Sequence, residues 1–251
     1  MKKKTNGVKI MKKKSILASS CALVFIILGT ASSAFATSYT DASHSTSNAT
    51  ITFEEDKEAG PIVDPTNPTA PILPDGPVNP TGSELMITYT SDLNFGTQSK
   101  QNKTWNALGE QVTDVSSGNT RNIAPFISVK DTRGTSRKGW SLTVKQDEDF
   151  KDTDGKVLTG AELSYSNLVS ALTVGAPTVK SGVISIGKDA AEFASADTNT
   201  GVGSWSIGLG SYDTELGTTN GVTLKVPTTT AKNTGSYSTT LTYELISDPT
   251  K

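Results

Sequence analysis

The chain of 251 residues is poor in the residue types on which most enzyme and metal chemistry depends. It has one cysteine, Cys21, and one histidine, His44. A Ser-His-Asp or Cys-His arrangement needs a histidine beside its nucleophile, and zinc sites are built mostly from cysteine and histidine. His44 falls in a Ser/Thr-rich segment outside the part expected to fold. We therefore expect no enzyme, no catalytic residue, no metal site and no cofactor.

Long hydrophobic runs are also scarce, and the single clear one lies near the start. Seven lysines up to position 14 precede an apolar run over 16–28, and small residues end in Ala34-Phe35-Ala36. This order is typical of a secretory signal peptide. A retained anchor is the weaker alternative because the run is shorter than the roughly 20 residues of a spanning helix, and lipidation of Cys21 is another. We expect residues 1–36 to be the signal, with no membrane insertion after cleavage.

Positive charge becomes scarce once the signal is removed. The chain has 23 Lys and Arg against 25 Asp and Glu, and the seven lysines of the signal leave 16 against 25, a net charge of −9. An acidic protein is poorly suited to bind nucleic acid through bulk charge. Removal of Cys21 also leaves no disulfide. The exported chain must therefore fold around its own core, for which about 170 residues suffice.

Proline is concentrated in one segment, over 37–81. After a Ser/Thr-rich start and a short acidic run, prolines stand at 61, 65, 68, 71, 74, 77 and 80. From position 65 they recur every third residue, which matches the three-residue turn of polyproline II. We predict a disordered Ser/Thr/Pro-rich stalk that is extended rather than collapsed. A proline-rich ligand for a partner domain is the alternative.

After Gly82 the pattern is that of an all-β domain over 82–251. Strand-like segments lie at 84–90, 126–130, 140–146, 182–186, 204–209, 221–226 and 237–246, with turn residues between them. The segment 187–196 is the one candidate for a short helix. Regularly spaced strands predict a single β-sandwich or an irregular barrel-like domain.

An acidic stretch, QDEDFKDTDGK over 146–156, is a weak candidate for a calcium loop. Aligning Asp152, Asp154 and Gly155 with an EF-hand places Phe150 and Ala161 at the first and last ligand positions. A solvated turn at Asp154-Gly155 fits better. A carboxylate pair for glycoside hydrolysis stays open, but no two acids are singled out.

Two strand-like segments share an aromatic-spacer-leucine pattern. GWSLTVKQ contains Trp140 and Leu142, and YSTTLTYELISDP contains Tyr243 and Leu245. Alternate residues of a strand share a face, so each aromatic shares an apolar face with its leucine. Such a face predicts core packing, in which each aromatic buries 150 to 250 Å². In the alternative, these aromatics line a groove and stack on sugar rings or on a partner.

The resemblance carried by these two segments, together with the D-x-R-G that precedes Trp140 and the upstream LMITYTSDLNFGTQ, is to a known family. The chain from about Gly82 to Lys251 resembles the WxL domain of Gram-positive surface proteins. Tyr243 departs from the family, which usually has Trp there. The resemblance implies a secreted surface protein, attached noncovalently to the cell wall, with peptidoglycan or a wall glycopolymer as its ligand. It also implies partners among other WxL proteins and membrane-anchored surface proteins. The competing expectation is an adhesion complex that binds host matrix protein or plant polysaccharide.

A local basic cluster interrupts the acidic chain around the first motif. Gram-positive walls are polyanionic and arginine suits phosphate and carboxylate geometry, so Arg133, Arg137 and Lys138 are candidate contacts with an anionic polymer. In the alternative, arginine braces nearby carbonyls or Asp131. The cluster consists of Lys130, Arg133, Arg137, Lys138 and Lys145.

Overall fold

The computed structural model describes residues 38–249, which form strands and irregular segments but no helix. The predicted signal peptide and Cys21 lie outside these residues. The chain divides into two units, residues 1–53 and 54–251. The described part of the first contains a small hairpin of β1 (Ser38–Tyr39) and β2 (Ser45–Thr46). No described helix is long and apolar enough to cross a membrane.

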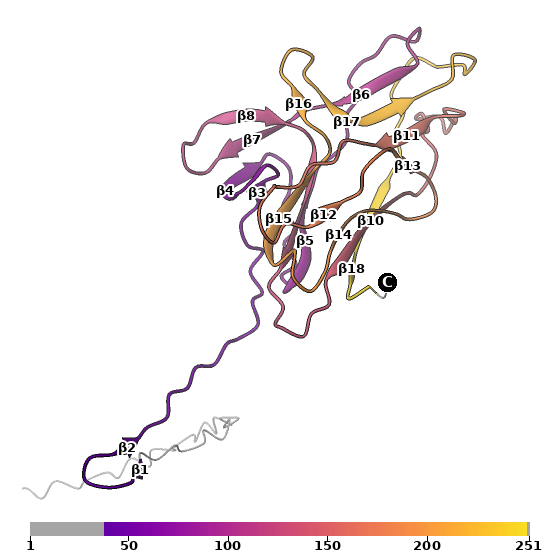
Figure 1. Ribbon diagram of the computed structural model, residues 1–251. Helices are drawn as coiled ribbons and strands as arrows, with labels where there is room; N and C mark the ends of the chain where they lie inside the picture. Colours follow the sequence, from indigo (N-terminus) through magenta and orange to yellow (C-terminus); the bar gives the residue numbers. More distant parts are fainter. Residues whose placement is uncertain (1–37, 250–251) are drawn as a thin grey trace, which may run out of the picture. The chain divides into compact units, whose positions relative to one another are not determined.

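One four-stranded sheet of the second unit has the order β12-β14-β10-β18. Its members are β12 (Thr178–Val179), β14 (Ala191–Ala196), β10 (Trp140–Gln146) and β18 (Leu241–Ser247). All neighbours are antiparallel. In Figure 1, β18 in yellow lies beside β10, although about a hundred residues separate them in sequence.

Three further sheets complete the unit. The first runs β13-β11-β17-β16, with β6 also on β17; the second runs β15-β9-β5; the third runs β3-β4-β7-β8. Their bounds are β3 (Val63–Asp64), β4 (Asn67–Pro74), β5 (Leu85–Thr90), β6 (Thr104–Leu108), β7 (Glu110–Asp114), β8 (Thr120–Ile123), β9 (Phe126–Asp131), β11 (Glu162–Tyr165), β13 (Ile184–Ile186), β15 (Gly203–Gly208), β16 (Tyr212–Asp213) and β17 (Thr218–Lys225).

Two apolar clusters hold the sheets together. The larger contains Trp140, Leu142, Tyr165 and Phe193, each with no exposed surface or nearly none, and the smaller surrounds Ile72 and Phe126. Alternate residues of β9 supply both clusters: Ile127 and Val129 face the larger and Phe126 the smaller. β9 therefore buries side chains on both faces, and the expected all-β sandwich or barrel-like class is confirmed.

The structure contains a strand at each of the seven expected places, but the one candidate for a short helix, at 187–196, is wrong. Residues 191–196 form β14, which pairs with β10 on one side and with β12 on the other. Ala191, Glu192 and Ala194 favour a helix locally. Two neighbouring strands supply hydrogen-bond partners for the backbone, and this tertiary pairing outweighs the local preference.

The proline-rich segment also differs from the expected stalk, because its second half is part of the fold. β4 pairs with β3 and β7, and Ile62, Val63 and Ile72 are buried. Prolines lack an N–H, but their carbonyls still accept: Val115 N–H donates to the Pro71 oxygen at 3.1 Å. The apolar residues between the prolines give the segment side chains to bury, and the spacing of the prolines alone does not reveal this.

Candidate functional site

The two aromatic motifs lie on neighbouring strands. In the β10–β18 ladder Leu142 stands opposite Leu245, and Val144 stands opposite Tyr243, without a shift of register. The motif residues therefore form one continuous apolar layer over two strands. The sequence predicted both strands and their apolar faces but not their pairing.

Trp140 lies wholly inside this layer. Its side chain has no exposed surface, and its indole N–H donates to the Gly201 carbonyl at 3.3 Å. A Cβ at Gly201 would lie 2.4 Å from Ala196 Cβ and 2.7 Å from Trp140 Nε1, and φ there is +72°. The loop that closes over the ring thus requires glycine. Trp140 is a core residue, not a surface platform.

Tyr243 is half-buried at the edge of the same layer, and its hydroxyl has a partner. The hydroxyls of Tyr243 and Tyr165 are 2.5 Å apart, and both rings meet Phe193 edge-on, with centroids 6.2 and 6.0 Å away. Burial raises the pKa of Tyr243 to about 12, while the hydrogen bond to Tyr165 acts in the opposite direction. Tyrosine in place of tryptophan is thus accommodated by a polar contact inside the core.

Arg133 joins the D-x-R-G segment to the end of β18. Its guanidinium donates to both carboxylate oxygens of Asp131 at 2.9 Å, to the Gly139 carbonyl at 2.8 Å and to Asp248 at 3.0 Å. Asp131 has no exposed surface. The bonds to Asp131, the largest contribution, raise the pKa of Arg133. This arrangement, which we call the closing bridge, is the bracing role that the sequence left open.

Asp248 occupies its place in the bridge through its backbone as well. Its N–H donates to the Gly139 carbonyl at 3.0 Å, and its φ is +47°, in the left-handed region. Its carboxylate accepts the Lys138 N–H at 2.8 Å, and this bond is the main cause that lowers the pKa of Asp248. The final S-D-P of the second motif is therefore docked on the loop that carries the first.

The other basic residues are distributed over different environments. Lys130 is buried and forms an ion pair with Asp56 at 3.2 Å, and Lys145 lies 3.7 Å from Asp147. Arg137 is half-buried and donates to the Thr198 carbonyl at 3.0 Å. Lys138 is exposed. Of the three candidate contacts, Arg133 is occupied by the closing bridge, and Arg137 and Lys138 lie beside it.

The acidic stretch at 146–156 forms a turn. Asp152 accepts the N–H groups of Asp154 at 3.1 Å and Lys156 at 2.8 Å, and Gly155 has φ +79°. Among residues 38–249 no group of three or more His, Cys, Asp or Glu is placed to hold a metal ion.

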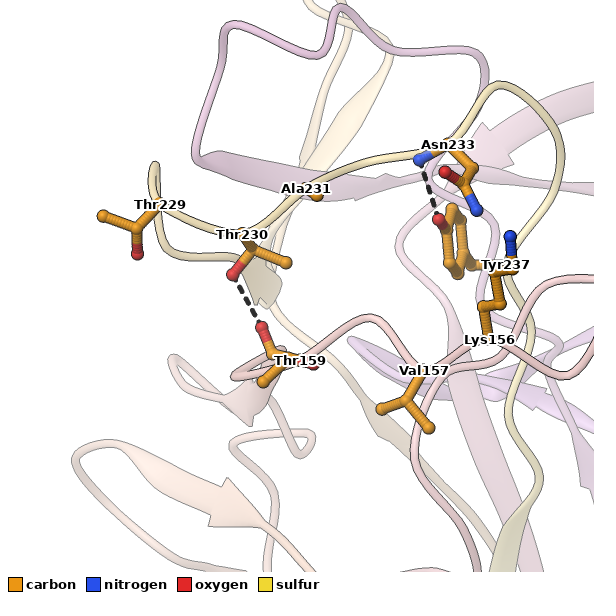
Figure 2. Close-up of a pocket in the computed structure, with 8 residues that line it drawn as sticks. All are labelled: Lys156, Val157, Thr159, Thr229, Thr230, Ala231, Asn233 and Tyr237. Carbon is orange, nitrogen blue, oxygen red and sulfur yellow. Dashed lines mark hydrogen bonds between the residues drawn. The ribbon is translucent and has the colours of Figure 1, made fainter.

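An open pocket of about 420 Å³ lies next to this turn (Figure 2). Tyr237 accepts the Asn233 N–H through its hydroxyl at 2.9 Å, and Thr230 donates to the Thr159 carbonyl at 2.7 Å. Lys156, at the rim, adds a cation. The sequence gives no sign of this pocket because its walls come from two loops that only the fold brings together. Its lining is Lys156, Val157, Thr159, Thr229, Thr230, Ala231, Asn233 and Tyr237.

Comparison with models of known protein families matches residues 40–249 to the WxL domain, described as a surface cell wall-binding domain. No curated protein and no solved structure matches the chain. The match begins well before Gly82, where the sequence analysis placed the start of the domain.

Proposed function

This chain belongs to the WxL family of surface cell wall-binding domains, and on that premise we propose that it is a secreted protein of a Gram-positive bacterium that attaches noncovalently to peptidoglycan. Its place is the cell wall at the cell surface. The family match over residues 40–249 carries the proposal. It spans nearly all the described residues, so the wall-binding module includes the proline-containing strands.

The pocket of Figure 2 is the surface we propose for glycan contact. A sugar presents hydroxyl groups together with an apolar face of C–H groups. The pocket offers the amide oxygen of Asn233, whose nitrogen donates to Asp152 at 3.0 Å, the hydroxyl oxygens of Thr229 and Thr230, and the aromatic side chain of Tyr237. A few convergent polar groups beside an apolar wall are characteristic of small-ligand sites. Lys156 supplies a cation suited to the carboxylates of wall peptides or to phosphate.

A second candidate function is assembly with protein partners in an adhesion complex. Leu172 and Val174 are fully exposed, and Val202 is 45% exposed. Their loops are joined by the Gly201 N–H, which donates to the Gly175 carbonyl at 2.7 Å. Exposed apolar residues gathered at one site are typical of protein-binding surfaces. This surface favours a partner protein over a sugar.

Binding to purified, protein-free sacculi separates the two functions. We expect the chain without its signal to sediment with sacculi, and Lys156→Ala combined with Thr229→Ala to weaken this binding. Lys188→Ala is the matched control, because Lys188 is also an exposed lysine with a carboxylate partner, Asp149, but does not line the pocket. Sacculi that retain none of the protein would reject the proposal. Binding restored only by added surface proteins would favour the adhesion complex.

A further inference from the structure

The segment before the folded unit has the pattern of a strand without a partner. Residues 47–55, which we call the N-terminal arm, read NATITFEE after Ser47. Ile51 and Phe53 alternate with threonine, yet they are 78% and 83% exposed, and residues 47–61 form no strand. β-branched and aromatic residues in alternation favour a sheet. Because the Ile51 and Phe53 side chains are exposed, this apolar face is not buried against another strand.

The arm starts from a fixed point on the folded unit. Just after it, Asp56 forms the ion pair with Lys130, and the Lys130 ammonium also donates to the Glu58 carbonyl. Lys130 lies in the middle of the β15-β9-β5 sheet, where it stands opposite Met86. A buried lysine with a carboxylate partner makes a firm anchor, because removing the carboxylate would leave the buried ammonium charge without its partner.

The folded unit has a seam at which two sheets end side by side, although Asn79 already donates to the Ile87 and Thr88 carbonyls on the outer side of β5. β5 and β18 each end a sheet, and their nearest Cα atoms lie within 8 Å of each other, but no described main-chain hydrogen bond joins them. The apolar side chains along the seam are only partly buried: Leu85 and Ile87 from β5, and Leu241, Tyr243 and Leu245 from β18.

The main chain of β18 presents free groups to this seam. At the two ends of the β10–β18 ladder, the Asp248 N–H donates to the Gly139 carbonyl at 3.0 Å and the Asp147 N–H donates to the Thr240 carbonyl at 2.9 Å. Bonding pairs alternate along an antiparallel ladder. The even-numbered residues of β18 therefore bond to β10, and the N–H and C=O groups of Leu241, Tyr243 and Leu245 point toward the seam.

We propose that the N-terminal arm of one copy adds to β18 of a second copy as an antiparallel strand. Phe53 then lies opposite Leu241, and Ile51 lies opposite Tyr243, so the apolar side chains of the arm complete the apolar row of the seam. Thr50 stands opposite Glu244, so no two carboxylates meet directly. The seam opens by a few ångströms, because a strand between two others needs about 9.5 Å between its neighbours.

The geometry selects a second copy over the same chain. The closing bridge ties Ser247 and Asp248 to the end of β9 near Lys130, so Leu241 lies at the far end of β18, about 20 Å away at 3.3 Å per residue. Phe53 lies three positions before the anchored Asp56, and three residue steps span at most about 11 Å. The arm of the same chain is too short for this pairing.

Engineered cysteines test the pairing directly, because the chain without its signal has none. Thr52 and Thr242 stand opposite each other in the proposed pairing. We expect an equimolar mixture of Thr52→Cys and Thr242→Cys to form a disulfide-linked heterodimer under mild oxidation. The mixture of Thr52→Cys with Thr229→Cys, an exposed threonine away from the seam, is the matched control. Light scattering should show that the molar mass of the unmodified protein approaches twice that of the monomer as its concentration rises, as expected for a symmetric dimer.

The variant Ile51→Asp with Phe53→Asp should stay monomeric and keep the melting temperature of the folded unit, since both side chains are exposed. The inference is overturned if the unmodified protein keeps the molar mass of a monomer at all concentrations, or if the two mixtures cross-link equally. A double variant, Thr52→Cys with Thr242→Cys, that closes a disulfide within one chain also overturns it. Sacculus binding is a separate measurement, so failure here leaves the proposed function standing.

Discussion

Trp140 is the residue whose loss should weaken the fold most directly. Its buried ring fills the space between β10 and the Gly201 loop. Trp140→Ala is expected to lower the free energy of unfolding by about 3 to 5 kcal/mol, because the lost contacts leave a cavity. Urea denaturation measures this. Leu172→Ala, at a fully exposed leucine, is the control and should change stability by less than about 0.5 kcal/mol. Equal effects in the two variants would contradict a core role for Trp140.

Loss of the Tyr243 proton should lower the free energy of unfolding at high pH. An unfolded tyrosine loses its proton near pH 10, whereas the pKa of folded Tyr243 is raised to about 12. Between these values the folded state holds a proton that the unfolded state has lost, so the free energy of unfolding falls as pH rises, by at most about 1.4 kcal/mol per pH unit. Below pH 10 this contribution is fully present.

The Tyr243→Phe variant isolates that effect. At pH 7 it should lose about 1 kcal/mol, because the Tyr165 hydroxyl is left without its partner. Between pH 10 and 12 its stability should decline less steeply than that of the unmodified protein. Denaturation across this range gives both slopes, and equal slopes would show that Tyr243 titrates normally.

At the scale of elements, the closing bridge holds β18 to the loop before β10. Its two acidic partners differ in exposure: Asp131 is wholly buried, whereas the Asp248 side chain is 42% exposed. Arg133→Ala should therefore cost about 3 to 5 kcal/mol, because it strands the buried Asp131 charge. Asp248→Asn should cost far less, because an exposed ion pair contributes little.

Thermal and urea unfolding of these two variants provide the comparison. Restoring charge balance with Asp131→Asn in the Arg133→Ala background should recover part of the loss. No recovery would mean that Arg133 acts through its other contacts, the Gly139 carbonyl and Asp248.

At the scale of the whole molecule, noncovalent attachment predicts how the protein leaves the wall. Denaturant unfolds the domain and breaks its contacts, so a chaotrope should release the protein from intact cells without enzymatic digestion of the wall. Immunoblots of the extract and of the remaining wall give the partition. Recovery only after muramidase treatment would indicate a covalent link.

Charge is expected to contribute to wall binding through the basic residues beside the closing bridge. Salt shortens the Debye length from about 10 Å at 0.1 M to about 3 Å at 1 M, so binding to intact walls should weaken with salt. Arg137→Ser combined with Lys138→Ser should lower both the affinity and its salt dependence. Arg133 stays unchanged in this variant because it supports the fold. An affinity that is flat with salt would assign binding to the uncharged contacts.

The sequence by itself determined the all-β class, seven strand positions, and the apolar faces of Trp140 with Leu142 and of Tyr243 with Leu245. These features follow from residue alternation and turn residues, which are local. The helix at 187–196 was wrong because pairing of β14 with its neighbours is not local. The stalk was wrong over β3 and β4 because burial of Ile62 and Ile72 depends on distant strands.

Only the tertiary structure decided the rest. Three features each join segments that are far apart in the chain. They are the pairing of β10 with β18, the contacts of Arg133 with Asp131 and Asp248, and the pocket beside Tyr237. Periodicity reports which face of a segment is apolar, and it carries no information about which other segment covers that face. That choice depends on the packing of the whole chain.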